Sequence, residues 1–208
     1  MNVLVTGGAG YIGSHTVREL LARGHRVIVY DLEPTDPSGP IAAATSVVGD
    51  VAETERLAAL MRDEAIDGVI HFAGRKFVAE AMRDPGRYFH VNVAGSLSVF
   101  EAMVAAGVVR IVFSSSCTVY GTPARNPVTE DMPLQPENPY GESKRMVEQM
   151  LRWYGQVHGL RSLSLRYFNA AGASLDAALG EHFDKTLMLI PMLMKAALGL
   201  RGPLDIYG

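Results

Sequence analysis

The sequence predicts an α/β protein in which helices cover both faces of a doubly wound parallel sheet, followed by the beginning of a smaller lobe. Three observations support this fold class. Short apolar segments alternate with longer helical segments up to residue 168. The apolar segments are continuous, as in strands that are buried on both faces of a parallel sheet. Hydrophobic residues make up 48% of the 208-residue chain, which suffices for one sizeable core.

The expected elements follow one another in a regular order from the amino terminus. Residues 2–5 form a short apolar run that stops at a glycine-rich turn, and residues 11–23 then show helical spacing up to Gly24. Gly107 stands where another helix should end. The remaining strands are expected over residues 26–30, 46–49, 69–72, 110–113 and 162–166, and the remaining helices over residues 53–64, 85–106 and 140–158.

The segment after residue 168 differs from the rest of the chain. Residues 169–185 read as a loop, and a single helix follows before Pro203. Such a tail is too short to build a domain of its own. We therefore expect one complete domain over residues 1–168 and the start of an incomplete domain over residues 169–208.

Composition and charge exclude several classes of function. The net charge is −3 and no Lys/Arg run exceeds two residues, so a nucleic-acid partner is not expected. The single cysteine, Cys117, excludes an internal disulfide and agrees with a reducing compartment. The six histidines lack the spacing of metal ligands. Neither a signal peptide nor a membrane-spanning segment is expected, because the first apolar run ends at glycines and residues 187–200 are too short, which favours a cytoplasmic protein.

The turn after the first expected strand has the glycine pattern of a dinucleotide-binding site. The sequence Thr6-Gly-Gly-Ala-Gly-Tyr-Ile-Gly13 contains GxGxxG between a strand and a helix. Glycines in this pattern allow a tight turn and bring the backbone close to a pyrophosphate. An acidic residue, Asp31, closes the next strand at about the 20-residue separation that is typical of the motif. The pattern predicts a Rossmann-type site, and the alternative is a purely structural turn with a solvated Asp31.

The identity of the residues around Asp31 predicts which dinucleotide binds. A carboxylate at the end of the second strand can accept hydrogen bonds from both ribose hydroxyls, and it repels a 2′-phosphate. Leu32 and Glu33 provide no arginine to pair with such a phosphate. We therefore expect NAD to be bound in preference to NADP.

Two more residue groups stand at the carboxyl ends of expected strands, where ligands bind in sheets of this kind. Asp50 follows the third strand and is expected to cap the next helix, to contact adenine, or both. Phe72-Ala73-Gly74 follows the fourth strand. His71 lies within that apolar strand, and we interpret it as a packed histidine instead of a catalytic base.

Tyr140 and Lys144 form a YxxxK pair at the start of a helix. A spacing of four residues places the phenol and the ammonium group on one helix face. The charge of Lys144, together with the positive nicotinamide ring of NAD⁺, should favour the phenolate and lower the pKa of Tyr140 towards neutrality. The hydroxyl-rich segment over residues 113–121 supplies Ser116 to bond a sugar hydroxyl or keto oxygen.

These motifs together resemble the UDP-glucose 4-epimerase family, which belongs to the extended short-chain dehydrogenases/reductases. The resemblance extends along essentially the whole chain. Related dehydratases and decarboxylases usually carry an acidic residue in the Ser/Thr segment, whereas this chain has Ser116, Cys117 and Thr118 there. That difference favours plain epimerisation. The segments that carry the resemblance are residues 6–13, 71–74, 114–121, 138–141 with Lys144, and 166–172.

The resemblance implies an enzyme that interconverts UDP-galactose and UDP-glucose through a transient 4-keto intermediate with tightly bound NAD. Ser116, Tyr140 and Lys144 would form the catalytic set, and the family forms homodimers. NAD would be contacted by Gly7, Gly10, Tyr11, Ile12, Gly13, Asp31, Asp50, Val51, Phe72, Ala73, Gly74, Lys76, Asn92, Ser114, Tyr140, Lys144 and Phe168. The UDP-sugar would be contacted by Lys76, Ser116, Tyr140, Asn169, Leu189, Asp205, Ile206 and Tyr207.

The chain departs from the family pattern at Leu32, at Phe77, where a small residue is usual, and at Met188, where an amide or imidazole is expected. The family also continues beyond Gly208 with further substrate-binding residues, so we expect a fragment or a natural truncation with little epimerase activity of its own. Two alternatives are another nucleotide-sugar epimerase, acting on an N-acetylated or uronic sugar, and a non-catalytic NAD-binding remnant.

Overall fold

The computed structural model describes residues 1–182, 186 and 188–204 and contains two compact units, residues 1–168 and residues 169–208. The first unit holds a six-stranded sheet in which every neighbouring pair is parallel, in the order β3-β2-β1-β4-β5-β6. The strands are β1 (Asn2–Thr6), β2 (Arg26–Asp31), β3 (Thr45–Val48), β4 (Gly68–His71), β5 (Arg110–Ser116) and β6 (Arg161–Tyr167). The predicted fold class, a doubly wound parallel α/β sheet, is confirmed.

The helices of the first unit lie in the connections between successive parallel strands, except that residues 32–44 join β2 to β3 without a helix. They are α1 (Tyr11–Ala22), α2 (Thr54–Asp63), α3 (Val78–Ala81), α4 (Pro85–Tyr88), the π-helix η1 (Phe89–Ala94), α5 (Gly95–Ala106), the 3₁₀ helix η2 (Cys117–Tyr120) and α6 (Pro139–His158). The strand order reverses direction between β1 and β4. A crevice at the carboxyl ends of these two strands is the usual binding position in such sheets.

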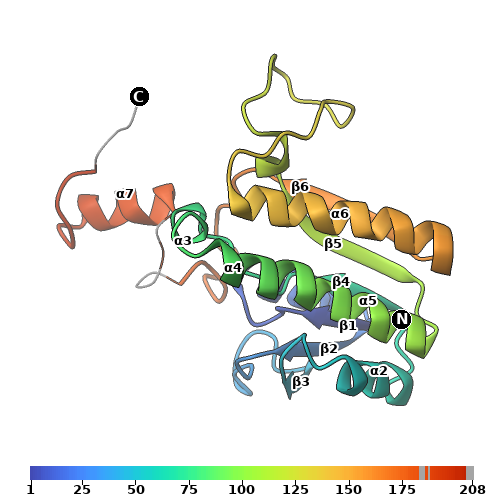
Figure 1. Cartoon of the computed structure of the whole chain (residues 1–208). Helices are drawn as coiled ribbons and strands as arrows, with labels where there is room; N and C mark the ends of the chain where they lie inside the picture. Colours follow the sequence, from blue (N-terminus) through green and yellow to red (C-terminus); the bar gives the residue numbers. More distant parts are fainter. Residues whose placement is uncertain (183–185, 187, 205–208) are drawn as a thin grey trace. The chain divides into compact units, whose positions relative to one another are not determined.

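Side chains on the central strands alternate between two hydrophobic cores, one on each face of the sheet. Leu4 and Ile28 point to the core that α2, α5 and α6 cover, whereas Val5 and Val29 point to the core that α1 covers. Figure 1 shows α2, α5 and α6 side by side on the first of these faces. Continuous apolar strands are therefore required, because both faces are buried.

The structure corrects two details of the expected secondary structure. The single helix expected over residues 85–106 is divided into α4, η1 and α5 by a π-helical segment, and α3 and η2 were not expected. Strand β5 also continues past Phe113 to Ser116, because Ser114, Ser115 and Ser116 pair with β6. Serines are weak strand formers, so the pairing with the neighbouring strand decides their conformation.

The segment Pro85–Ala106 is, among the described residues, the one helix long and apolar enough to cross a membrane. Its apolar side chains have a different explanation. Val99, Phe100 and Met103 are fully buried in the core of the first unit, against the sheet and the neighbouring helices. We therefore interpret it as a core helix.

The described part of the second unit contains one helix, α7 (Leu189–Ala197), which is apolar and has no buried residue. Met188 stands at its N-cap, and the Met188 amide donates to the Thr186 hydroxyl at 3.0 Å. Leu189 begins the helix and is exposed.

His71 lies at the end of β4 within a chain of buried hydrogen bonds, as expected for a packed histidine. Its Nδ1 lies 2.6 Å from the Thr6 hydroxyl and its Nε2 lies 2.9 Å from the Ser96 hydroxyl. Since Ser96 Oγ donates to the Asn92 carbonyl at 2.5 Å, it accepts from Nε2–H, and Nδ1 accepts from Thr6. Burial, with a smaller contribution from the charge of Lys144, lowers the pKa of His71 to about 3.

We expect the His71 ring to stay neutral and protonated at Nε2 from neutral pH down to about pH 4. The unfolded chain binds this proton at the ordinary histidine pKa. The free energy of unfolding should therefore fall, as pH drops below that value, by about 1.4 kcal/mol per pH unit. Ring ¹⁵N chemical shifts measure the protonation state of His71 directly. The other five histidines, none of them fully buried, are controls in the same sample. A midpoint for His71 near neutrality would contradict the prediction.

Candidate cofactor and active site

The glycine-rich turn between β1 and α1 lies against the segment that follows β4. Gly7 has φ +71°, and a Cβ there would lie 2.5 Å from the amide nitrogen of Ala73. A Cβ at Gly13 would overlap the Gly7 carbonyl oxygen and lie 2.8 Å from the Gly8 Cα. Gly10 is exposed, caps α1 without a side-chain hydrogen bond, and precedes a first turn, opened by Tyr11 and Ile12, with no acidic residue. The result is an open backbone surface at a helix N-terminus, which suits an anion.

Asp31 has a contact that the sequence did not predict. Its Oδ2 accepts a hydrogen bond from the Ala9 amide at 3.0 Å, so the carboxylate holds the glycine-rich turn. The Asp31 side chain is half-buried at the end of β2. The neighbouring Leu32, one of the departures from the family pattern, is 66% exposed.

Asp50 does not cap α2, contrary to one of the two roles expected for it. The N-cap position is Glu53, and Asp50 Oδ1 instead accepts from the Ala52 amide at 2.9 Å in the preceding turn. The buried phenol of Tyr30 fixes this turn, since it donates to the Glu53 carboxylate at 2.9 Å and lies 3.2 Å from the Asp50 carbonyl. Val51 is buried directly after Asp50.

The segment after β4 is held by backbone contacts and by Asn92. The amides of Phe72 and Ala73 both donate to the Thr6 carbonyl, at 2.9 and 3.1 Å. The buried Asn92 amide accepts from the Arg75 N–H at 2.8 Å and donates to its carbonyl at 3.1 Å. A Cβ at Gly74 would lie 3.0 Å from Asn92 Oδ1 and 3.7 Å from Lys144 Nζ. The predicted residues Phe72 to Gly74, Asn92 and Lys144 are thus brought together.

Lys144 is buried beside Tyr140 at the end of β5. Its ammonium group donates to the Ser114 carbonyl at 2.9 Å and lies 5.9 Å from the centre of the Tyr140 ring. It also lies over the Phe113 ring at 4.9 Å. Burial lowers the pKa of Lys144 to about 8. The expected placement of phenol and ammonium on one helix face is confirmed.

The expected effect of Lys144 on the acidity of Tyr140 is not found among the residues of the chain. Burial raises the pKa of Tyr140, a hydrogen bond with Ser116 lowers it by less, and Cys117 adds to the rise. The group that favours the phenolate is therefore the Ser116 hydroxyl. Ser116 is itself buried and accepts from the Thr118 hydroxyl at 2.9 Å.

An ion pair between the partly buried Arg166 and the buried Glu148 was not predicted. Arg166 on β6 donates to both carboxylate oxygens of Glu148, at 3.0 and 2.7 Å, and the Ser115 hydroxyl donates to the same carboxylate at 2.5 Å. Arg166 also donates to the Tyr120 hydroxyl at 2.7 Å. The sequence feature that could have indicated this ion pair is Glu148, because it lies four residues after Lys144 on the buried face of α6. A carboxylate on such a face requires a buried partner.

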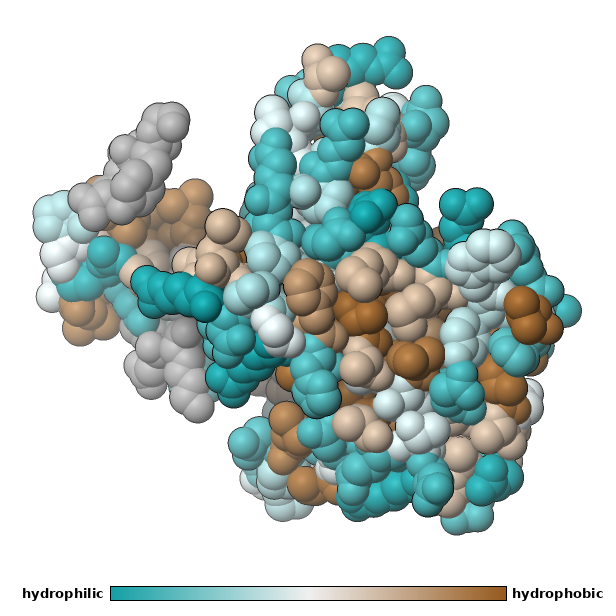
Figure 2. Space-filling view, viewed as in Figure 1, coloured by the Kyte–Doolittle hydropathy of each residue, from teal (hydrophilic) through white to brown (hydrophobic). Residues whose placement is uncertain are grey.

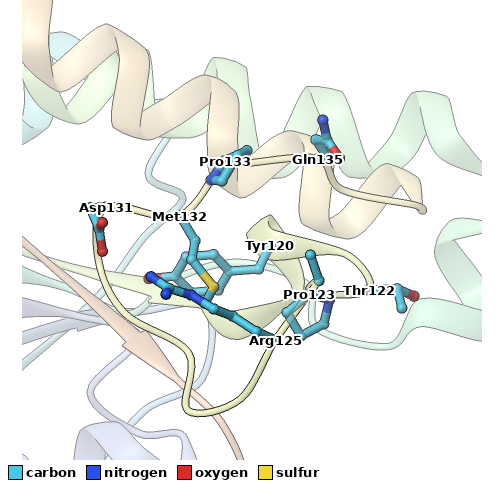
Figure 3. A pocket seen from close by; sticks show the side chains of 9 residues that line it. Tyr120, Thr122, Pro123, Arg125, Asp131, Met132, Pro133 and Gln135 are labelled. Atoms are coloured by element: carbon cyan, nitrogen blue, oxygen red, sulfur yellow. The ribbon is translucent and has the colours of Figure 1, made fainter.

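The loop after η2 forms a pocket of about 320 Å³. Figure 3 shows Tyr120, Arg125 and Met132 among the side chains of its wall. None of its lining residues belongs to the predicted site. They are Tyr120, Thr122, Pro123, Ala124, Arg125, Asp131, Met132, Pro133 and Gln135.

The other residues that were predicted to contact NAD or the UDP-sugar are distributed between the two units. Lys76 is exposed after Arg75, and Phe168, at the end of the first unit, is 60% exposed. Asn169 and Leu189 belong to the second unit. Asp205, Ile206 and Tyr207 lie outside the described residues. Within the described ranges, no group of three His, Cys, Asp or Glu side chains could hold a metal ion.

Comparison with known proteins decides the family. Residues 3–208 match the model of the NAD dependent epimerase/dehydratase family. The chain belongs to this family.

Other epimerase/dehydratase family members are similar along the whole chain. The UDP-glucose 4-epimerase of Lactobacillus helveticus is 44% identical over 100% of this chain and 63% of its own length. The crystal structure of the Brucella ovis UDP-glucose 4-epimerase in complex with NAD has a TM-score of 0.94 at 43% identity, over 100% and 64% of the two chains. The Stenotrophomonas maltophila enzyme with bound NAD and formylated UDP-arabinopyranose has a TM-score of 0.93 at 42% identity, over 100% and 65%. The chain therefore spans less than two thirds of these relatives.

For this family member, we expect Gly13→Ala to destabilise the fold much more than Gly10→Ala. The new methyl group at position 13 meets backbone atoms, whereas at position 10 its nearest neighbour is 3.3 Å away. Overpacking against atoms that cannot move should cost about 1–3 kcal/mol. Urea unfolding of both variants measures the difference. Equal stability of the two variants would show that the turn adjusts.

Proposed function

We propose that the chain is the NAD-binding part of a UDP-glucose 4-epimerase. In this function, tightly bound NAD serves the interconversion of UDP-galactose and UDP-glucose through a transient 4-keto intermediate. The observation that carries the proposal is the arrangement of Tyr140, Lys144 and Ser116 at the end of β5, at the same edge of the parallel sheet as the glycine-rich turn after β1. The UDP-glucose 4-epimerases with the same fold support the proposed substrate class.

The residues of the first unit suit NAD on geometric grounds. The glycine-rich turn leaves no room for side chains at Gly7 and Gly13, and its outer surface at Gly10 is exposed backbone. A pyrophosphate would lie there, at the N-terminus of α1. Asp31 would accept hydrogen bonds from the adenosine ribose, and Asp50 with Val51 would flank the adenine. Gly74, Asn92 and Lys144 would lie along the nicotinamide half.

NAD, when bound, would supply the hydride acceptor and donor for C4 of the sugar. The chain's own residues would move the proton. The Tyr140 phenol oxygen would take the proton of the 4-hydroxyl and return it, with Ser116 as the adjacent relay. The buried ammonium of Lys144, fixed on the Ser114 carbonyl, would favour the phenolate once the positive charge of the cofactor adds to its own.

Exposed apolar residues on the first unit support a homodimer as the form in which the protein acts. Leu97 is 41%, Trp153 66% and Val157 69% exposed, on the outward faces of α5 and α6. Figure 2 shows apolar residues gathered over the part of the surface where these helices lie in Figure 1. Paired helices from two subunits would cover them.

A cytoplasmic location agrees with an NAD-dependent sugar-nucleotide enzyme.

The decisive experiment separates cofactor binding from turnover. The purified chain should release NAD on denaturation but convert UDP-galactose slowly or not at all. Joined after Gly208 to the part of the Lactobacillus helveticus enzyme that it does not cover, it should gain turnover. Tyr140→Phe in that fusion should keep NAD and lose about 10²–10⁴-fold in rate. A fusion that holds NAD without turnover would favour a non-catalytic remnant, and absence of NAD would refute the proposal.

Two substitutions at Asp31 should separate its two contacts. Asp31→Ala should weaken NAD binding by about 1–3 kcal/mol and reduce the preference for NAD over NADP. Asp31→Asn keeps an acceptor for the Ala9 amide and loses the charge. The affinity for NAD should therefore fall less than in Asp31→Ala, while the affinity for NADP should rise. Calorimetric titration with both dinucleotides measures each effect. Unchanged NAD affinity in Asp31→Ala would remove this carboxylate from the ribose site.

A further inference from the structure

The segment Arg75-Lys76-Phe77 is held at both ends by residues of one helical segment. Asn92 binds both backbone groups of Arg75. The Tyr88 hydroxyl does the same for Phe77, since it accepts from the Phe77 amide at 3.0 Å and lies 2.8 Å from the Phe77 carbonyl. Tyr88 and Asn92 are four residues apart across the start of the π-helix η1, so both side chains reach the same segment. Lys76 is exposed between these two fixed points.

The Tyr88 ring connects the same segment to the proposed catalytic base. Tyr88 is fully buried, and its ring meets the Tyr140 ring edge to face, with centroids 6.3 Å apart and planes at 81°. This geometry is favourable for aromatic pairs. Asn92 makes a second connection, because its amide donates to the Ser143 hydroxyl at 3.0 Å and Ser143 donates to the Tyr140 carbonyl at 2.7 Å.

The Tyr88 hydroxyl has one proton for two acceptors. The Phe77 carbonyl lies at 2.8 Å and a Glu80 carboxylate oxygen at 2.9 Å. Burial and the bond with Glu80 raise the pKa of Tyr88 to about 12, so the hydroxyl stays protonated at neutral pH. Glu80 is in turn paired with Arg75 at 2.5 Å. The hydroxyl therefore closes a ring of contacts around Lys76 that includes Arg75, Phe77 and Glu80.

We propose that Tyr88 is a positioning residue that fixes the Lys76 segment through its hydroxyl and the Tyr140 phenol through its ring. This inference rests on the proposed function for the roles of Lys76 and Tyr140. The two parts of the side chain act separately. Removal of the hydroxyl should free the Phe77 backbone, and removal of the ring should expose one side of the Tyr140 phenol to water.

Two substitutions test the two parts, and Tyr154→Phe is the matched control. Tyr154 is on the same helix as Tyr140, its hydroxyl also bonds a glutamate, Glu101, and its ring packs on Phe100. In Tyr88→Phe, hydrogen exchange at the Phe77 amide should become about 2- to 10-fold faster, the equivalent of one lost hydrogen bond. In Tyr88→Leu, the pKa of Tyr140 should fall, because burial is what raises it. The control should change neither quantity.

Both quantities are measured by NMR, with ¹³Cζ-labelled tyrosine assigned through Tyr140→Phe, and neither needs a ligand. The affinity for NAD should also fall about 2- to 10-fold in Tyr88→Phe and stay unchanged in the control. Unchanged exchange at Phe77 in Tyr88→Phe overturns the proposal, even if Tyr88→Leu does not fold. If the parent binds no NAD, the proposed function fails, while the exchange rate and the Tyr140 pKa still decide the role of Tyr88.

Discussion

The close approach of two backbone segments at the reversal of the strand order determines the rest of the first unit. At this point the Thr6 carbonyl accepts from two successive amides, those of Phe72 and Ala73, and Gly7 lies directly against Ala73. No side chain fits between the two segments. The floor of the proposed cofactor site is therefore backbone, and its shape depends on these hydrogen bonds and on glycines that leave no room for a Cβ. Glycine is required at position 7 by both the positive φ and the contact.

Polar contacts connect this floor to the proposed catalytic helix without interruption. They run from Thr6 through His71 and Ser96 to the backbone of Asn92. The Asn92 side chain then reaches Arg75 on one side and, through Ser143, the Tyr140 carbonyl on the other. Buried polar groups are costly unless all are satisfied, and here each one has a partner. This accounts for buried histidine, serine and asparagine in the middle of an otherwise apolar core.

The sequence predicted the fold class and the Tyr140–Lys144 geometry because both depend on local patterns. Apolar runs, glycine turns and a four-residue spacing can be recognised without knowledge of distant residues. The unpredicted features depend on tertiary contacts. The π-helical segment around Asn92 and the serine-rich end of β5 are set by neighbours that are distant in sequence. The pKa of Tyr140 depends on how deeply the ring is buried, which the YxxxK spacing does not specify.

The ion pair between Arg166 and Glu148 also has a mechanical consequence for the joint between the two units. Arg166 lies two residues before the end of the first unit, on β6, which pairs only with β5 in the part of the chain that the structure describes. A force on the second unit would reach that strand first. Separation of β6 from the sheet would leave the Glu148 carboxylate in the interior without Arg166, at a cost of about 3–5 kcal/mol. The ion pair lies one residue before Tyr167, the strand partner of Ser116, so β6 is anchored to α6 next to the point where the chain leaves the sheet.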